Sequence, residues 1–416
     1  MSDRKQRVVV NGHQSEILNI HAGVPQGSVL GPLLFLIYIN DISDNLTGEA
    51  FLFADDTSLF HHVNKCLPTC LSNVNSDLTK INQWAKQWLI CINSKKTVSM
   101  FFTTKRPNIK LPPIHLGNAV LEQVYLHKHL GVTLMPTLNW NEHISNIIAK
   151  ANKRLSTLKC IKYRVSRKAL EICYSSFVRP ILEYGNVLYD SCTKEQSERI
   201  ENVQRDAARV IIGAKKRSSG NLLYKELGWQ SLKHRRYIHK MVKLYAVVNK
   251  ISPQYLTDTL LSFQRAHVHN TRTVSNSLLD TPRTKKVLFS KSFFISAINS
   301  WNKLDICLRN VPSKGSFRRN IMAMYKIGTP VSNNNISRKA QIILGQLRIE
   351  FSDLNAHLFD KDCVESPNCG CGHSKEDTKH FLMTCPTYTE IRNDMFHAIH
   401  LVSELSHQPS IASLWK

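Results

Sequence analysis

The sequence predicts an α+β protein with more than one domain. Strand-like and helix-like segments alternate over residues 1–140, whereas the apolar spacing over residues 141–335 is mainly that of helices. Cysteines and histidines gather close to the C-terminal end. Because the chain has 416 residues, two or three domains are expected rather than one. We therefore expect an α+β unit, a helical part and a small C-terminal element.

The N-terminal segment has the pattern of a β-hairpin followed by an apolar helix. Residues 7–10 and 17–20 are strand-like, and Asn11-Gly12 between them is the pair that favours a two-residue turn. Residues 28–42 are apolar at nearly every position. A helix without a polar face is normally buried on most sides, and that is the expectation for this one.

Two adjacent acids, Asp55 and Asp56, stand between short strand-like runs at residues 51–54 and 58–60. Carboxylates held together at the tip of a hairpin repel each other unless a cation lies between them, so a divalent-metal site is one interpretation. The alternative is that Asp55 and Asp56 only reverse the chain, as aspartate often does in turns.

Further segments complete the α+β unit. The expected elements are a helix over residues 71–88 and strands over residues 98–102, 114–116, 120–125 and 130–134. From there to residue 213 the pattern is that of helices alone. A mainly helical stretch, residues 214–335, follows, with a polar interruption over residues 267–286 and an expected linker at residues 332–335.

Positive charge dominates the start of the helical part. Between residues 141 and 170 a single acid, Glu142, stands against eight basic residues. These are Lys150, Lys153, Arg154, Lys159, Lys162, Arg164, Arg167 and Lys168. Since a solvated helix face normally mixes both signs, this run predicts a surface for a polyanion.

The whole chain is basic as well. It has 55 Lys and Arg against 31 Asp and Glu, a formal net charge of +24. The resulting field favours polyanions, with nucleic acid as the first candidate. A basic protein of a ribosome or of a membrane surface would have the same balance, so the motifs must decide.

Neither a secretory leader nor a membrane span is expected. The N-terminus is polar, and the most apolar run, residues 29–39, is 11 residues long and contains Pro32, whereas a span needs about 20. Of 11 cysteines, seven are scattered singly. We therefore expect a soluble, intracellular chain with reduced thiols rather than a disulfide framework.

The remaining cysteines lie near the C-terminal end. Cys369 and Cys371 form a C-x-C pair, and His380 and Cys385 follow with four residues between them. Three thiolates and an imidazole suit tetrahedral Zn²⁺, and a closed set of four ligands would make a structural site. Buried or unrelated cysteines are the alternative, and His373 or Cys363 could replace one of the ligands.

Several short motifs recur along the chain. They are GVPQG at residues 23–27, YIND at 38–41, FADD at 53–56, NSKKT at 93–97, HLGV at 129–132, LNW at 138–140, VRPILEY at 178–184, VQR at 203–205 and WNKL at 301–304. Together they resemble the reverse transcriptases of non-LTR, LINE-like and jockey-like retrotransposons. The resemblance covers most of the chain and becomes less specific after about residue 215. A C-terminal cysteine and histidine element is also familiar in this family, where it is thought to hold nucleic acid.

The resemblance implies a right-handed polymerase palm that uses Mg²⁺ or Mn²⁺ to join nucleotides. It assigns Asp55 as a direct metal ligand, Asp56 as its partner and Lys96 to the departing phosphate. It places Pro25, Gln26 and Gly27 against template and nucleotide, and Leu130 and Gly131 at the primer end. The implied partners are an RNA template and a DNA primer or target, in a nuclear or cytoplasmic ribonucleoprotein. The implied parts are a partial palm (residues 1–140), a basic helical thumb (141–213), a helical connector (214–335) and a C-terminal region with a zinc knuckle (336–416).

One departure from the family pattern bears on activity. The palm needs a further metal-binding aspartate on a strand before the first hairpin, and the acids before Gly23 are Asp3 and Glu16, neither in such a context. We therefore expect the C-terminal part of a larger polyprotein that does not polymerise by itself. Two alternatives stay open: a non-enzymatic, nucleic-acid-binding remnant of a retroelement, and a maturase-like RNA-binding protein.

Overall fold

The structure is a computed structural model that describes residues 4–20, 23–24, 27–63, 66–103, 109–264, 277–284, 286–325 and 337–394. It divides into two compact units, Met1–Leu138 and Asn139–Lys416. The first mixes strands and helices, and the described part of the second is helical, so the predicted α+β class is confirmed. The expected linker at residues 332–335 lies outside the described residues. No helix in the described ranges combines the length and apolarity that crossing a bilayer requires.

The strands of the first unit form two-stranded ladders. They are β1 (Arg4–Gln6), β2 (Val9–Val10), β3 (His13–Gln14), β4 (Leu18–Ile20), β5 (Glu49–Phe53), β6 (Asp56–Phe60), β7 (Val98–Ser99), β8 (His115–Leu116), β9 (Ala119–Val120), β10 (Glu122–Gln123), β11 (His127–His129) and β12 (Val132–Leu134). The pairs β1–β4, β2–β3, β5–β6, β8–β9 and β11–β12 are antiparallel, and β7–β10 is parallel. The predicted turn at Asn11-Gly12 joins β2 to β3, with both residues at positive φ.

The helices of this unit are α1 (Gly31–Ile39), the 3₁₀ turn η1 (Asn40–Ser43) and α2 (Leu67–Gln87). The prediction that the first helix is buried on most sides is wrong for the described structure, because Leu33 is 54% exposed and Ile37 is 66% exposed. One edge of α1, at Ile39, packs with Ile81 of α2. Tyr38 of α1 also contacts Trp88, which follows α2. Apolar composition alone could not indicate which faces of the helix would be covered.

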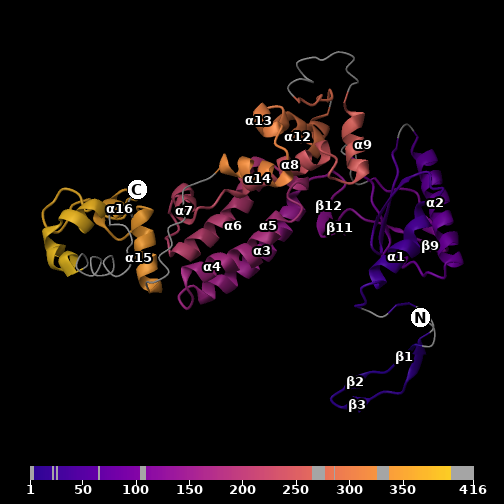
Figure 1. Ribbon diagram of the computed structural model, residues 1–416, viewed down its shortest axis with the longest axis horizontal. Helices are drawn as coiled ribbons and strands as arrows, with labels where there is room; N and C mark the ends of the chain where they lie inside the picture. The colour runs from indigo at the N-terminus through magenta and orange to yellow at the C-terminus, as the bar shows by residue number, and fades with distance from the viewer. Residues whose placement is uncertain are drawn as a thin grey trace. The chain divides into compact units, whose positions relative to one another are not determined.

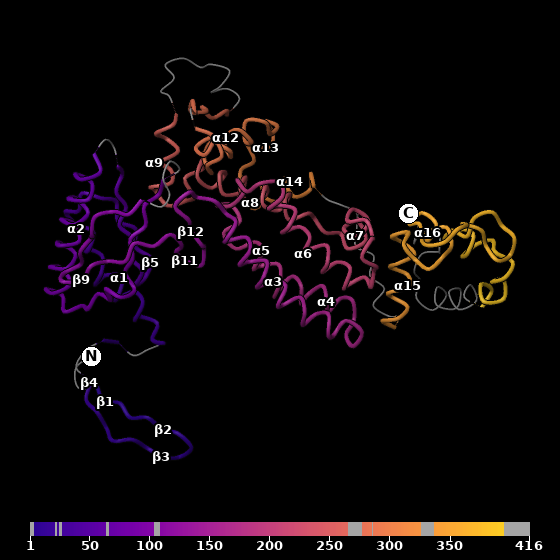
Figure 2. The backbone as a smooth tube through the Cα atoms, turned by 180° about the vertical axis from the view of Figure 1, so that it is seen from behind, coloured from indigo at the N-terminus to yellow at the C-terminus, as the bar shows by residue number. Residues whose placement is uncertain are grey.

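The second unit is built from helices. They are α3 (Asn141–Ile161), α4 (Arg167–Cys173), the π-helix η2 (Tyr174–Val178), α5 (Arg179–Glu183), η3 (Leu188–Ser191), α6 (Lys194–Ile212), α7 (Gly220–Leu227), α8 (Leu232–Val248), α9 (Gln254–Ser262), α11 (Val287–Ser290), α12 (Phe293–Trp301), α13 (Ile306–Arg309), α14 (Lys314–Ala323), α15 (Arg338–Arg348), α16 (Asn355–Phe359), the π turn η4 (His380–Thr384) and η5 (Pro386–Tyr388). Figures 1 and 2 both show α3, α5 and α6 side by side.

Two apolar cores hold this unit together. The first joins α3, η2, α5, α6 and α7, so it continues across residue 213, where the sequence placed a boundary. The second joins α8, α12 and α14 around Tyr245, Trp301 and Phe317. The rings of Tyr245 and Phe317 stack with centroids 4.6 Å apart. Burial of such large rings dominates the energetics of small helical cores.

Helix α15 is fastened to the end of α6. Gly213 ends α6 at φ 81°, and a Cβ there would lie 2.6 Å from the side chain of Ile342, so the close approach needs glycine. Arg338 Nη2 donates to the Ile211 carbonyl at 2.5 Å, and Gln346 Nε2 donates to the Gly213 carbonyl at 2.7 Å. Helix α15 therefore packs onto the first core.

Arg167 belongs to this framework and not to a free surface. Its side chain is buried, and its Nη1 donates to Glu226 Oε1 at 2.7 Å while Nη2 donates to the Glu226 carbonyl at 2.8 Å. Arg348 reaches the same Glu226 oxygen at 3.1 Å. Arg167 must therefore be removed from the predicted nucleic-acid-binding set, because its guanidinium is already engaged in the interior.

Candidate functional site

Asp55 and Asp56 lie at the tip of the β5–β6 hairpin. The last pair of the ladder is Phe53 with Asp56, so the chain reverses through Ala54 and Asp55, and Ala54 adopts φ 52°. Both aspartates are exposed. The structure thus presents two adjacent carboxylates to solvent on a short, regular hairpin, as the sequence predicted.

The inner face of this hairpin is held by apolar contacts. Leu52 of β5 and Leu59 of β6 point to the same side and pack against Ile39, Ile42 and Ile81. The alternation of side chains along a strand places neighbouring residues on the opposite face. On this face the hairpin is therefore supported by the apolar contacts of the unit.

Asp77 of α2 fixes the segment that leads into β5. Its buried carboxylate accepts hydrogen bonds from the Thr47 backbone N–H at 2.8 Å, the Thr47 hydroxyl at 2.9 Å and the Gly48 N–H at 2.8 Å. This role of Asp77 was not predicted from the sequence. The sequence does contain an indication of it. Asp77 falls on the apolar face of its helix, three residues after Val74 and four before Ile81, where an acid is expected to be buried and to have hydrogen-bond partners.

The same carboxylate lies next to the residue that ends the hairpin. His61, directly after β6, has its Nε2 3.2 Å from Asp77 Oδ2. A Cβ on Gly48 would come within 2.4 Å of that ring, so a larger residue there would have to displace the imidazole of His61. Burial tends to raise the pKa of Asp77, but the hydrogen bonds from Thr47 and Gly48 outweigh it and hold the pKa below its ordinary value of 3.8.

The predicted primer-end turn contacts this hairpin. Leu130 and Gly131 connect β11 to β12 with φ 44° and 82°. His129, just before the turn, has its Nε2 3.5 Å from Ser58 Oγ, two residues after Asp56. The structure therefore brings the Leu130-Gly131 hairpin and the aspartate hairpin together.

The other predicted polymerase residues are less closely connected to the aspartates. Lys96 is exposed in a turn organised by Asn93, whose Oδ1 accepts from the Lys96 N–H at 3.2 Å. Gly27 is exposed at φ 83°, and Pro25 and Gln26 lie outside the described residues. In the part of the chain that the structure describes, no third His, Cys, Asp or Glu joins Asp55 and Asp56 in a group that could share an ion.

Most of the predicted basic surface is exposed. Helix α3 buries Ile144, Ile147, Ala151, Leu155 and Leu158. Its basic residues Lys150, Lys153, Arg154 and Lys159 are exposed, as are Arg164 and Lys168 beyond it. Lys162 is half-buried, with its Nζ 4.5 Å from the Tyr163 ring. Within the described ranges none of these seven forms an ion pair, so their charge is available to a ligand.

The C-terminal cluster brings the four predicted ligands together. The potential ligand atoms of Cys369, Cys371, His380 and Cys385 all lie within 4.8 Å of one another. Cys371 Sγ is 3.2 Å from His380 Nε2, and Cys369 Sγ is 3.7 Å from Cys385 Sγ. Cys369, His380 and Cys385 are buried. Such a set of soft donors fits Zn²⁺.

Neighbouring groups orient these side chains. His380 Nδ1 lies 3.1 Å from Thr384 Oγ1, which leaves Nε2 to face the thiols. The backbone N–H of His380 donates to Asp377 Oδ1 at 2.8 Å. The two alternative ligands stay outside the cluster. His373 stacks on the His380 ring at 4.1 Å and accepts from the Lys375 N–H through Nδ1, and Cys363 is exposed.

Protonation of Cys369 opposes metal binding at this cluster. The N–H of Cys371 lowers the pKa of Cys369, but burial and the neighbouring thiols outweigh it and raise the pKa of Cys369 to about 11. An ion would therefore have to displace protons, since the thiolate is the ligand.

Comparison with known proteins shows which proteins the chain resembles. The family "Reverse transcriptase (RNA-dependent DNA polymerase)" matches residues 4–134, which include both hairpins described above. The chain is related to the reverse transcriptases of jockey-like, non-LTR retrotransposons, as its motifs predicted.

Three relatives illustrate the extent of the similarity. The chain is 30% identical to "RNA-directed DNA polymerase from mobile element jockey" of Drosophila melanogaster over 225 residues, 51% of this chain and 24% of the relative. It is 29% identical to "Probable RNA-directed DNA polymerase from transposon BS" of the same fly over 55% of this chain and 26% of the relative. A Pol polyprotein from retrotransposable element R1 2 of Nasonia vitripennis is 21% identical over 89% of this chain and 87% of its own length. The chain thus spans about a quarter of the two fly proteins.

Replacing Asp77 by Ala is predicted to loosen the hairpin. The Thr47 and Gly48 N–H groups would lose their acceptor, so amide hydrogen exchange across residues 46–61 should accelerate at least about tenfold. Asp44→Ala, an exposed aspartate in the same unit, is the matched control and should leave exchange unchanged. Equal exchange in both variants would contradict the anchoring role.

The pH dependence of this protection gives a second readout. Because the folded pKa of Asp77 is lowered, its stabilisation is present above the ordinary pKa and is lost as pH falls through the folded value. Protection factors of residues 46–61 should therefore fall below about pH 4 in the wild type. In Asp77→Asn the step should be absent.

Proposed function

We propose that this chain forms part of an RNA-directed DNA polymerase of a non-LTR retrotransposon, with Asp55 and Asp56 as ligands of Mg²⁺ or Mn²⁺. The observation that carries the proposal is the pair of exposed carboxylates at the tip of an anchored hairpin, inside the segment that matches the reverse transcriptase family. The donor set fits a hard divalent cation, which prefers carboxylate oxygens.

The chain's own residues have distinct parts in the proposed reaction. A bound divalent ion supplies the charge that activates a primer 3′-hydroxyl and stabilises the leaving pyrophosphate. Asp55 and Asp56 hold that charge in place, and Asp77 positions them by fixing the base of their hairpin. The Leu130-Gly131 turn orients the primer end through the contact between His129 and Ser58. Lys96 neutralises the departing phosphate, and the loop of Pro25, Gln26 and Gly27 faces template and nucleotide.

Primer extension tests the proposed activity. Two carboxylates do not complete a two-ion site, and positioning for in-line attack is worth roughly 7–11 kcal/mol of barrier. We predict no extension on an RNA template by residues 1–416 with Mg²⁺ or Mn²⁺. Joining the corresponding upstream part of the jockey polymerase before residue 4 should produce extension.

Matched variants in that fusion separate chemistry from folding. Asp55→Asn should abolish extension, whereas Asp44→Asn should retain it, since both remove one exposed acid from the same unit. Extension that persists in Asp55→Asn would refute the assignment of the metal ligands. Extension by residues 1–416 alone would refute the need for a further carboxylate.

We also propose that the exposed basic residues of α3 and the segment after it bind the phosphate backbone of template and primer, as a polymerase thumb does. Lys150, Lys153 and Arg154 carry the proposal, because they are exposed and form no ion pair in the described structure. Contacts of this kind are independent of base sequence and release counterions.

Salt dependence tests the thumb. Affinity for single-stranded RNA should fall steeply with salt, with a logarithmic slope of about −0.7 for each phosphate contacted. Changing Lys150, Lys153 and Arg154 to Glu should flatten this slope and weaken binding. The control changes Lys243, Lys250 and Lys303, which are exposed on other helices or loops, to Glu. If both triple variants lost the same affinity, only net charge would matter and the thumb assignment would fail.

We propose that the C-terminal cluster is a structural zinc knuckle, with Cys369, Cys371, His380 and Cys385 as ligands. A closed set of four ligands leaves no position for substrate, so the ion would stabilise the fold. The full chain should contain about one zinc ion per molecule. Cys371→Ser and His380→Ala should lose it, and Cys363→Ser and His373→Ala should keep it. Retention of zinc by the first pair, or its loss from the second pair, would contradict the proposed ligand set.

A further inference from the structure

A cavity of about 440 Å³ opens between helices of the second unit. Its walls include Arg179 of α5, Gln204 of α6, Trp229 and Gln230 between α7 and α8, Arg235 of α8 and Arg319 of α14. None of these is among the polymerase, thumb or zinc residues proposed above. Pockets that hold small ligands commonly measure about 300–1,000 Å³, so one nucleotide would fit.

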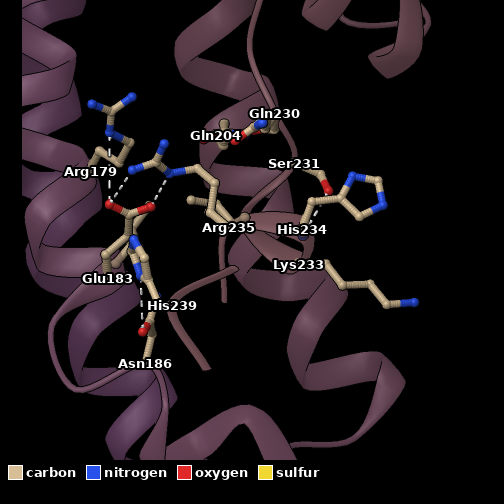
Figure 3. A network of polar contacts seen from close by, with 12 residues as sticks. Arg179, Glu183, Asn186, Gln204, Gln230, Ser231, Lys233, His234, Arg235 and His239 are labelled. Atoms are coloured by element: carbon tan, nitrogen blue, oxygen red, sulfur yellow. Dashed lines mark hydrogen bonds and ion pairs between the residues drawn. The ribbon is translucent and has the colours of Figure 1, made fainter. Parts of the chain in front are cut away.

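Positive charge exceeds negative charge around this cavity. Figure 3 shows the guanidinium groups of Arg179 and Arg235 directed at one carboxylate, that of Glu183. Arg235 Nη2 donates to Glu183 Oε2 at 3.0 Å and its Nε donates to the other oxygen, whereas Arg179 Nε lies 3.9 Å from Oε2. Arg235 is therefore satisfied, and Arg179 keeps donors available.

Further basic residues add to this charge. Arg319 donates to Ser316 Oγ at 3.0 Å and has no acidic partner in the described ranges. Arg318 and His239 line a smaller neighbouring pocket, which shares Arg235 with this cavity. Burial and the nearby Arg235 lower the pKa of Arg179, as expected at a site of positive potential. A bound anion would offset this potential.

The aromatic wall is fixed in place. The Trp229 ring stacks on the buried Tyr174 ring with centroids 4.4 Å apart, and the Tyr174 hydroxyl donates to Gln204 Oε1 at 2.7 Å. Gln204 Nε2 donates to the Gln230 carbonyl at 3.0 Å, and Gln230 Nε2 donates to the Met322 carbonyl at 3.0 Å. These bonds tie α6 and α14 to the same loop, so the cavity is formed before any ligand binds.

We infer that this cavity binds one nucleotide of a single-stranded nucleic acid, with the phosphate on Arg179 and Arg319 and the base against Trp229. A guanidinium matches the geometry of a phosphate, and each such charge-assisted hydrogen bond is among the strong ones. Aromatic rings beside arginines are how proteins hold unpaired bases. The site goes beyond the proposed polymerase function, because it requires neither the aspartate hairpin nor catalysis.

Photocrosslinking of the full chain tests this site. The probes are a 12-nucleotide oligouridylate containing 4-thiouridine and an oligothymidylate of the same length containing 4-thiothymidine. Irradiation should attach either probe to peptides that contain Trp229 or Met322. Arg179→Gln with Arg319→Gln should reduce this crosslinking about tenfold, because the charge-assisted hydrogen bonds to the phosphate are lost. Arg235 is left unchanged so that Glu183 keeps its partner.

A charge-matched control separates the site from general electrostatics. Lys314→Gln with Lys243→Gln removes the same charge from α14 and α8, outside the cavity walls, and should change crosslinking less than about twofold. Crosslinks at the cavity with either probe support the inference, and crosslinks with the RNA probe alone would mark the ligand as RNA. Crosslinks confined to α3 peptides, or equal yields in the two double variants with unchanged circular dichroism, would overturn it and leave the thumb proposal standing.

Discussion

The carboxylate of Asp77 is the interaction on which the aspartate hairpin depends. A buried carboxylate without partners would cost several kcal/mol, so its environment must supply donors. The Thr47 and Gly48 N–H groups do so before β5, and His61 lies beside it after β6. Both ends of the hairpin are thereby fixed to α2, and the positions of Asp55 and Asp56 follow from that attachment.

The second unit uses its positive charge in two different ways. Arg167 and Arg235 are held by Glu226 and Glu183, and these pairs connect helices. Lys150, Lys153 and Arg154 have no acidic partner in the described structure and face solvent. Only part of the positive charge behind the net +24 is therefore available to a ligand. A polyanion would meet the exposed set, whereas the paired arginines keep the fold together.

Features set by short-range chemistry could be predicted from the sequence. The Asn11-Gly12 turn, the aspartate hairpin and the spacing of Cys369, Cys371, His380 and Cys385 each depend on a few neighbouring residues, and the structure places all of them as expected. The motifs also predicted the relationship to reverse transcriptases, which the matching family and relatives confirm.

Features that depend on distant partners could not be predicted in this way. Arg167 belongs to a run of basic residues, yet Glu226, 59 positions away, draws it into the core. The exposed faces of α1 depend on which segments pack beside it, and apolar composition carries no such information. The cavity beside Trp229 unites residues from α5, α6, α8 and α14, which only the tertiary structure brings together.

The central claim is that Asp55 and Asp56 hold a divalent ion at the tip of an anchored hairpin. Paramagnetic broadening by Mn²⁺ in the full chain, labelled with ¹⁵N-phenylalanine and loaded with zinc, tests this claim most directly. The account predicts that the amide signal of Phe53 broadens on adding Mn²⁺ while that of Phe317, in the core of the second unit, stays sharp. Changing both aspartates to Asn should restore the Phe53 signal. A Phe53 signal that Mn²⁺ leaves unchanged, or that broadens equally in the double variant, would contradict the account.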